Sequence, residues 1–346
     1  MTTDAGARAP RIVSLLPAAT EIVAALDALG QLAGVTHECD HPASVTHLPR
    51  VTSSAIDRDA PSAAIDADVR ALASTGAPVF TLDAQLLASL APEVLLTQSV
   101  CDVCALPESA VDRAVATLVT APTVVSLGGT TLDGVWDDVR RVGDAIGRRA
   151  EAEALVEAAT ARIRRVHETL KAARAPRPRV VVIEWMSPLF VAGHWSPELV
   201  RRAGGIDVLA EPGAHSVQVD VDAVRAADPE VLLFAPCGFD ADRAACEAEA
   251  LLETDAWRWA GDRAVWALDG NSLTSRPGPR LVDAIEVMAA IFAPDLFEGP
   301  ATGYARRITM RAEEGPAVPG TADVASTQTR SAGSRNAPPN LDEERS

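Results

Sequence analysis

Five consecutive side chains with metal-binding chemistry stand directly after the short apolar segment 32–35. They are His37, Glu38, Cys39, Asp40 and His41. Neutral imidazole and thiolate groups suit transition metals such as zinc, copper, iron or cobalt. In an extended loop alternate residues face one side, so His37, Cys39 and His41 would lie together. The cluster predicts ligation of a transition metal or hydrogen bonding to a bound chelate. A polar loop whose side chains cap turns is the alternative.

A second group of soft ligands is the CxxC pair Cys101 and Cys104, which follows the apolar segment 94–97. Such a pair can act as a redox dithiol or as half of a tetrahedral metal site. The chain has no second CxxC, so a self-contained zinc ribbon is not indicated. Three hypotheses stay open: a metal site shared with His37 or Cys39, a redox pair near the start of the helix at Pro107, and two buried thiols that pack as small apolar residues.

Aromatic and imidazole side chains follow the apolar segment 180–184 in the second half of the chain. Trp185 comes directly after it, and His194 and Trp195 stand further along the same connection. Aromatic rings bury a large area and stack well on flat ligands. We therefore expect Trp185 to contact a ligand. His194 or Trp195 would add an axial or stacking contact, or one of them packs on the helix that starts at Pro197.

Two later apolar segments are also followed by side chains suited to ligand binding. Cys237 and Phe239 come after the segment 231–235, and Asn271 and Arg276 come after the segment 264–267. Arg276 would hold an anionic group such as a carboxylate or phosphate, and a salt bridge to a neighbouring carboxylate is the alternative. We expect ligand contacts from Phe239, Asn271 and Arg276, and a thiol ligand at Cys237.

Short apolar segments alternate with helical segments on both sides of a long stretch without proline. The stretch fits two helices, at about 132–147 and 149–174, and the second is rich in the strong helix formers Ala, Glu, Arg and Leu. This pattern predicts an α/β fold, in which two Rossmann-like doubly wound lobes with mainly parallel sheets are joined by one long backbone helix. Ligands bind such sheets at the carboxyl ends of the strands, where all the side chains described above are found.

The domain boundaries follow from the same pattern. We place an N-terminal lobe at 11–130, a helical segment that includes the bridging helix at 131–175, and a C-terminal lobe at 176–298. After about residue 312 the composition shifts to Ser, Thr, Gly, Pro, Ala, Asn and charged residues. That shift predicts a disordered tail over 313–346.

Composition excludes several classes of protein. A net charge of −17 argues against binding to nucleic acid or to anionic membranes, and no segment approaches the roughly 18 uninterrupted apolar residues of a membrane helix. The sequence contains neither GxGxxG after a strand nor a P-loop nor G-x-S-x-G. The first residues lack the pattern of a secretory signal, and five cysteines fit a reducing compartment. We expect a monomeric, cytoplasmic protein.

Several segments together resemble one known family. They are RIVSLLPAATE at 11–21, GVTHECDHP at 34–42, APEVLL at 91–96 and the helix at 276–286. Their order and spacing are similar to those of the class III binding proteins, which serve ABC importers for cobalamin, ferric siderophores and haem. Within that family the chain looks most like the signal-less branch labelled cobalamin-binding proteins. The resemblance covers about residues 11–295.

The resemblance implies a non-catalytic protein that holds cobalamin or another metal chelate in a cleft between two lobes. It also implies an ABC permease as partner. The family docks its importer through one acidic residue on each lobe, and the matching positions here are Gln85 and Asp222. One of the two carboxylates is therefore missing. The alternative function is a cytoplasmic metal-handling or thiol-redox protein with Cys39, Cys101, Cys104 and Cys237 as its working thiols.

Overall fold

The computed structural model describes residues 8–100, 106–300 and 303–309. Four parallel strands form the first sheet, in the order β2-β1-β5-β6. Their bounds are Ile12–Ser14 (β1), Leu32–Val35 (β2), Val94–Gln98 (β5) and Thr123–Leu127 (β6). Strands β1, β2 and β5 are largely buried because helices cover both sides of the sheet, whereas the edge strand β6 has Thr123 and Val124 exposed.

Two hydrophobic cores lie on opposite faces of this sheet. Ile12 of β1 belongs to the core with helices α1 and α5, whereas its neighbour Val13 belongs to the core with α3 and α4. The helices are Pro17–Ala25 (α1), Ala84–Leu90 (α3), Glu108–Val115 (α4) and Leu132–Ala145 (α5). Alternate residues of a strand point to opposite faces, so this short strand supplies both cores.

A small antiparallel pair and a helix lie between β2 and β5, where the sequence shows no regular pattern. The elements are Thr52–Ser54 (β3), Ser62–Thr75 (α2) and Phe80–Leu82 (β4), and β3 pairs with β4. Short 3₁₀ helices occur at Leu29–Gln31 (η1), Ala43–Val45 (η2) and Asp255–Asp262 (η3).

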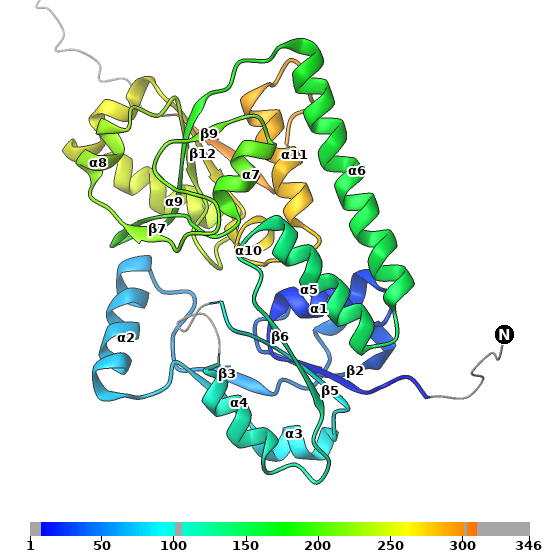
Figure 1. The fold of residues 1–346 in the computed structure, drawn as a ribbon. Helices are drawn as coiled ribbons and strands as arrows, with labels where there is room; N and C mark the ends of the chain where they lie inside the picture. The colour runs from blue at the N-terminus through cyan, green and yellow to red at the C-terminus, as the bar shows by residue number, and fades with distance from the viewer. Residues whose placement is uncertain (1–7, 101–105, 301–302, 310–346) are drawn as a thin grey trace, which may run out of the picture. The chain divides into compact units, whose positions relative to one another are not determined.

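The helix α6 (Arg149–Ala173) is the longest in the described part of the chain. It matches the predicted helix at 149–174 and, at 1.5 Å per residue, spans about 38 Å. It packs on α5 at one end and on the later helices α7 and α11 further along (Figure 1). The helix ends at Arg174, whose φ of 51° is left-handed.

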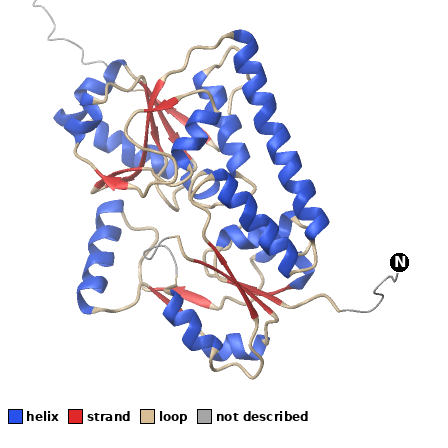
Figure 2. Ribbon diagram, viewed as in Figure 1, coloured by secondary structure: helices blue, strands red, loops and turns tan. Residues whose placement is uncertain are grey.

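The second sheet is larger and mixed, in the order β10-β8-β7-β11-β12-β13, with β9 also pairing with β7. Its strands are Arg179–Met186 (β7), Leu189–Val191 (β8), Ile206–Asp207 (β9), Val217–Gln218 (β10), Val231–Phe234 (β11), Ala264–Leu268 (β12) and Ala305–Ile308 (β13). Its helices are Ser196–Arg202 (α7), Val221–Ala226 (α8), Ala241–Leu252 (α9), Gly270–Leu273 (α10) and Leu281–Phe292 (α11). Figure 2 shows helices beside both sheets.

The prediction of two Rossmann-like lobes joined by a long helix is confirmed. The second sheet differs from the expected parallel sheet because β8, β10 and β13 are antiparallel to their neighbours. Strand β13 also carries this sheet beyond residue 298, where we placed the end of the C-terminal lobe. The predicted tail at 313–346 lies outside the described residues. No helix in the described ranges has the length and apolarity needed to cross a membrane.

Aspartates begin several of the helices that follow strands. Asp83, Asp220, Asp240 and Asp269 each accept a hydrogen bond from the backbone N–H three residues on, at 2.7–2.8 Å. Each carboxylate satisfies one of the backbone donors that a helix start leaves unpaired. These caps fix where α3, α8, α9 and α10 leave their sheets.

Helix α10 packs very closely on the end of β11. A Cβ added to Gly270 would lie 2.2 Å from the Pro236 carbonyl oxygen and 2.7 Å from the Ala235 carbonyl carbon. We expect Gly270→Ala to lower the free energy of unfolding by about 1–3 kcal/mol, because the backbone must shift to admit the methyl group. Urea denaturation checks this. Gly261→Ala is the control, since nothing lies within 4 Å of its added Cβ, and equal losses would contradict the packing argument.

Candidate functional site

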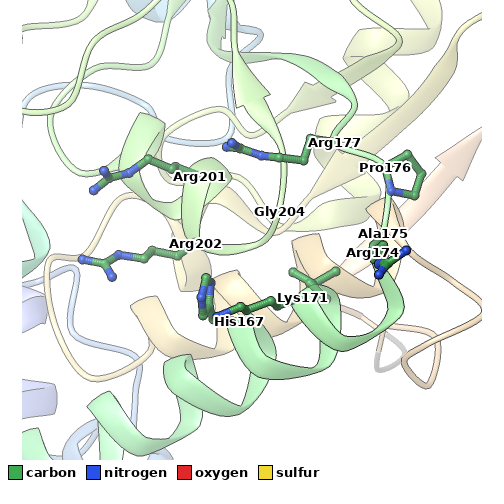
Figure 3. Close-up of a pocket in the computed structure, with 10 residues that line it drawn as sticks. His167, Lys171, Arg174, Ala175, Pro176, Arg177, Arg201, Arg202 and Gly204 are labelled. Carbon is green, nitrogen blue, oxygen red and sulfur yellow. The ribbon is translucent and has the colours of Figure 1, made fainter.

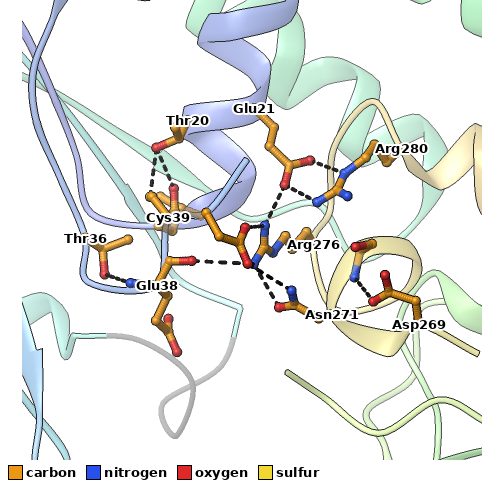
Figure 4. Close-up of polar contacts among 12 residues, drawn as sticks. Thr20, Glu21, Thr36, Glu38, Cys39, Asp269, Asn271, Arg276 and Arg280 are labelled. Atoms are coloured by element: carbon orange, nitrogen blue, oxygen red, sulfur yellow. Dashed lines mark hydrogen bonds and ion pairs between the residues drawn. The ribbon is translucent and has the colours of Figure 1, made fainter. Parts of the chain in front are cut away.

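Loops that follow strand ends in both sheets meet at one place, which we call the lobe junction. It comprises 36–41 after β2, 58–62 before α2, Trp185, Phe239, Arg243, Glu247 and 271–276. Arg276 binds Asp40 and Glu21 across the two lobes, and Asn271 donates to Asp40 (Figure 4). The expectation that side chains at the carboxyl ends of strands come together therefore holds for these residues.

Arg276 is the centre of this junction and is only 5% exposed. Its Nη1 donates to Glu21 Oε1 at 2.9 Å and to Asp40 Oδ1 at 2.5 Å, and its Nη2 donates to Asp40 Oδ2 at 3.0 Å and to Asn271 Oδ1 at 2.8 Å. Burial alone would raise the pKa of Asp40, but the hydrogen bonds and charge of Arg276 lower it overall. Of the two interpretations of Arg276, the structure shows the salt bridge to neighbouring carboxylates. The protein's own Asp40 and Glu21 occupy its guanidinium.

The carboxylate of Glu21, on α1, was not among the predicted site residues. It is 4% exposed and accepts from Arg276 and also from Arg280, whose Nε lies 2.8 Å from Oε2. A buried charge is stable only when it is paired and hydrogen-bonded. The sequence did contain one indication of this buried carboxylate. Glu21 stands inside the apolar run 18–23, whereas a surface helix would place an acidic residue on its exposed face.

His37 is half-buried and held by hydrogen bonds. Its Nδ1 lies 2.7 Å from Thr52 Oγ1, its backbone N–H donates to the same oxygen at 3.0 Å, and its ring centroid is 5.5 Å from that of Phe80. Burial lowers the pKa of His37, and the nearby charges of Arg58 and Arg50 lower it further. The imidazole is therefore held in its neutral form, the form that binds metals.

The loop after β2 is not extended. The Cys39 N–H donates to the Thr36 carbonyl at 3.2 Å, so the chain turns at this point. As a result the prediction that His37, Cys39 and His41 share one side is wrong: Cys39 is 1% exposed, whereas His41 is exposed. Glu38 is half-buried, and burial raises its pKa, opposed by the charge of Arg276.

Cys39 packs into the core beneath α1. Its Sγ lies 3.1 Å from Thr20 Oγ1, and burial raises the pKa of the thiol to about 11. Within the described residues, no three His, Cys, Asp or Glu side chains are placed to hold a metal ion. A metal site built on Cys39, Cys237 and the described histidines is therefore not formed. Cys101 and Cys104 lie outside the described residues, so the roles proposed for them stay predictions.

We expect Cys39 to resist alkylation in the native protein. At pH 8 a thiol with a pKa near 11 is ionised in about one molecule in a thousand, and its sulfur is shielded from solvent. Cys246 is exposed and serves as the internal control. Peptide mapping after iodoacetamide treatment should show Cys246 modified well before Cys39. Equal rates would contradict the buried placement.

Trp185 and Phe239 form an edge-to-face pair at the carboxyl ends of β7 and β11. Their ring centroids are 5.6 Å apart, and the indole N–H of Trp185 donates to the Ser187 carbonyl at 3.1 Å. Phe239 is 2% exposed, with the Arg243 guanidinium 3.4 Å above its ring. Phe239 is thus covered in this arrangement, and its predicted ligand contact stays a prediction. Trp185 is only half-buried and keeps an accessible surface.

A second set of bonds across the lobes involves residues that the sequence did not indicate. Arg243, on α9, donates to the carbonyls of Arg58 and Ala60 at 2.5 and 2.6 Å. Glu247, one turn later, accepts from the Ser62 N–H at 3.1 and 3.2 Å. Long-range pairs of this kind leave no local pattern, so only the folded chain reveals them.

His194 and Trp195 occupy a different setting. The indole N–H of Trp195 donates to the Thr274 carbonyl at 2.7 Å and the side chain is 7% exposed, so Trp195 packs rather than stacks on a ligand. His194 has a left-handed φ of 53° and its ring lies 5.3 Å from that of His215. Burial lowers the pKa of His194, and its Nε2 is buried with no hydrogen-bond partner.

A small hollow lies beside the loop after β2 and is lined by residues of the first lobe alone. It has a volume of about 10 Å³ and is lined by Leu15, Thr36, His37, Glu38, Thr52, Phe80 and Leu106. That is room for about one water molecule, whereas pockets for organic ligands measure about 300–1,000 Å³. This hollow by itself is therefore too small for a macrocycle.

Comparison with known proteins gives consistent matches. A family model described as "Periplasmic binding protein" matches residues 12–260. A vitamin B12-binding protein of Vibrio cholerae is 23% identical over 292 residues, which cover 80% of this chain and 87% of that protein. A periplasmic heme-binding protein of Pseudomonas aeruginosa has a similar structure, with a TM-score of 0.66 at 23% identity over 88% of this chain and 100% of that one. The periplasmic vitamin B12-binding protein of Vibrio cholerae aligns with a TM-score of 0.57 at 19% identity, over 82% and 96%.

Proposed function

The chain belongs to the periplasmic binding protein family, and from this premise we propose that it binds cobalamin, haem or a similar macrocyclic metal chelate at the lobe junction. The observation that supports the proposal is the meeting of strand-end loops from both lobes around Arg276, Asp40 and Arg243. The relatives named for vitamin B12 and heme support the class of ligand.

Membership in the family confirms the resemblance noticed in the sequence and the expectation of a binding protein rather than an enzyme. It contradicts the expected cytoplasmic location, because the family and the similar solved proteins are periplasmic. The cysteine count misled that prediction. A thiol such as Cys39, which is buried and protonated, needs no reducing compartment to stay free.

Ligand binding in this proposal depends on side chains that keep accessible surface at the junction. Trp185 stacks on the macrocycle, and the neutral imidazole of His37 or the exposed His41 supplies a ligand to the metal. Glu38 and Asn271 hydrogen-bond to polar substituents of the ligand. Arg276 is not among these contacts, because Glu21 and Asp40 occupy its guanidinium.

We further propose that an ABC permease receives the ligand, with Gln85 and Asp222 on the docking faces. Gln85 lies on α3 and is exposed, and Asp222 lies on α8 with 76% of its side chain exposed. Asp222 pairs with Arg225 at 3.1 Å, an exposed pair that a basic partner could replace at little cost.

Absorbance titration with cyanocobalamin and, separately, with haemin tests the proposal. We expect one of them to bind at one molecule per chain, with weaker binding in Trp185→Ala and a changed metal spectrum in His37→Ala or His41→Ala. Trp259→Ala is the matched control, because Trp259 stacks on Trp257 away from the junction. Failure of both compounds to bind would refute the proposal.

A further inference from the structure

A second, larger pocket lies at the far end of α6, away from the lobe junction. It has a volume of about 380 Å³ and lies between the last turns of α6, the chain that follows it, and the end of α7. Figure 3 shows His167 and Lys171 on α6, Arg177 on the following segment, and Arg201 and Arg202 on α7 around this space. We call it the basic pocket. None of its lining residues belongs to the lobe junction.

The charge of the basic pocket is opposite to that of the whole chain. Its lining includes Lys171, Arg174, Arg177, Arg201 and Arg202, and none of the ten lining residues is acidic. The chain as a whole has a net charge of −17, and Lys171 is its only lysine. Five cations around one hollow repel each other, so an anion that entered the hollow would stabilise the arrangement.

Several of these side chains are already held in place. Arg201 and Arg202 both donate to Oε1 of Glu198, at 3.1 and 2.9 Å, and Glu198 is itself 5% exposed. Arg177 donates to the Gly205 carbonyl at 2.8 Å. The buried carboxylate neutralises one charge and leaves the pocket positive. Side chains fixed before binding lose less entropy when a ligand arrives.

The backbone keeps the walls of the pocket close together. Gly204 has a left-handed φ of 97°, and a Cβ there would lie 2.8 Å from Leu170 Cδ1 of α6. Arg174 also has a left-handed φ, which turns the chain sharply from α6 toward Arg177. The two segments thus approach closely enough to form the walls of a half-open pocket.

We propose that the basic pocket binds a small soluble anion that carries more than one phosphate group. Arginine and lysine are the side chains that recognise phosphate oxygens, and 380 Å³ lies within the size range of small-ligand sites. Cations near helix C-termini also interact with the helix dipole, which accounts for Arg174, Arg201 and Arg202. The helix dipole does not account for Arg177, which lies beyond α6, nor for the half-open pocket that these side chains line.

The single lysine provides a direct probe. Reductive methylation with ¹³C-formaldehyde labels Lys171 and the α-amino group and keeps their charges, so the lysine gives one identifiable dimethylamine NMR signal. Inorganic pyrophosphate should shift this signal in a saturable manner, whereas NaCl at the same ionic strength should not. An unsaturable shift, or an equal shift with NaCl, would overturn the proposal.

Two double variants separate the pocket from general surface charge. Arg177→Met/Arg202→Met removes two lining cations, and Arg164→Met/Arg165→Met removes two exposed cations of α6 that do not line the pocket. We expect about a tenfold or larger loss of pyrophosphate affinity in the first only, with cyanocobalamin or haemin binding unchanged in both. Equal losses in both would overturn the proposal. So would a Lys171 shift produced by phosphatidylglycerol vesicles but not by pyrophosphate.

Discussion

Replacing Glu21 by glutamine is expected to lower the free energy of unfolding by about 3–5 kcal/mol, the cost of breaking a buried ion pair from one side. Glu21 is 4% exposed and is shared by Arg276, at 5% exposure, and Arg280. Without the carboxylate, two guanidinium groups face each other in a site with little water. Asp40 remains on one side of Arg276, but Arg280 loses its partner in the core.

Urea denaturation followed by circular dichroism measures this loss. The matched control is Glu249→Gln, which breaks the half-exposed pair with Arg306 at 2.9 Å and should cost less than about 1 kcal/mol. If Glu21→Gln cost no more than this control, Glu21 would be solvated and the buried network would be absent. The combined variant Glu21→Met/Arg276→Met/Arg280→Met should recover part of the stability, because apolar side chains replace a complete buried network at little cost.

The lobes and the bridging helix were predictable because the sequence patterns that specify them lie within short segments of the chain. Apolar strands separated by helical stretches define the lobes, and the helix predicted at 149–174, which Pro176 follows, matches α6 within one residue. Strands β8, β9 and β10 were missed because they are two or three residues long. Helix α2 was missed because most of its apolar residues are alanines, with Ile65, Val69 and Leu72 the only larger ones, and because it buries little of its surface.

The candidate site was predicted less well, because its ion pairs and hydrogen bonds join residues that are far apart in the sequence. The sequence indicated Arg276 and the loop at 37–41, but not that Asp40 and Glu21 would neutralise the arginine. Cys39 looked like a metal ligand because thiols are soft. Its burial against Thr20 follows from the turn at Thr36, which a residue pattern does not reveal.

The second large expected effect is on ligand binding, in variants that weaken the contacts across the lobe junction. Asp40→Asn combined with Glu247→Gln is expected to speed ligand association and to tighten binding by about tenfold. Hydrogen bonds join the loop at Asp40 to Arg276 and the segment 58–62 to α9 across the junction, so a macrocycle that binds between these loops must part them. Apparent affinity falls with the fraction of molecules in the competent, open arrangement. The two changes weaken the Arg276–Asp40 and Ser62–Glu247 contacts that hold the lobes together.

Stopped-flow absorbance with cyanocobalamin or haemin, whichever the unmodified protein binds, measures the association rate. The control is Asp137→Asn/Glu153→Gln, which weakens two ion pairs of Arg140, one within α5 and one from α5 to α6, and leaves the junction unchanged. Weakening each cross-lobe contact by roughly 1 kcal/mol shifts the closed–open equilibrium enough for the expected effect. Slower association or weaker binding would mean that Asp40 and Glu247 keep their cross-lobe contacts in the ligand-bound protein, so that the lobes close around the ligand without separating at these two points.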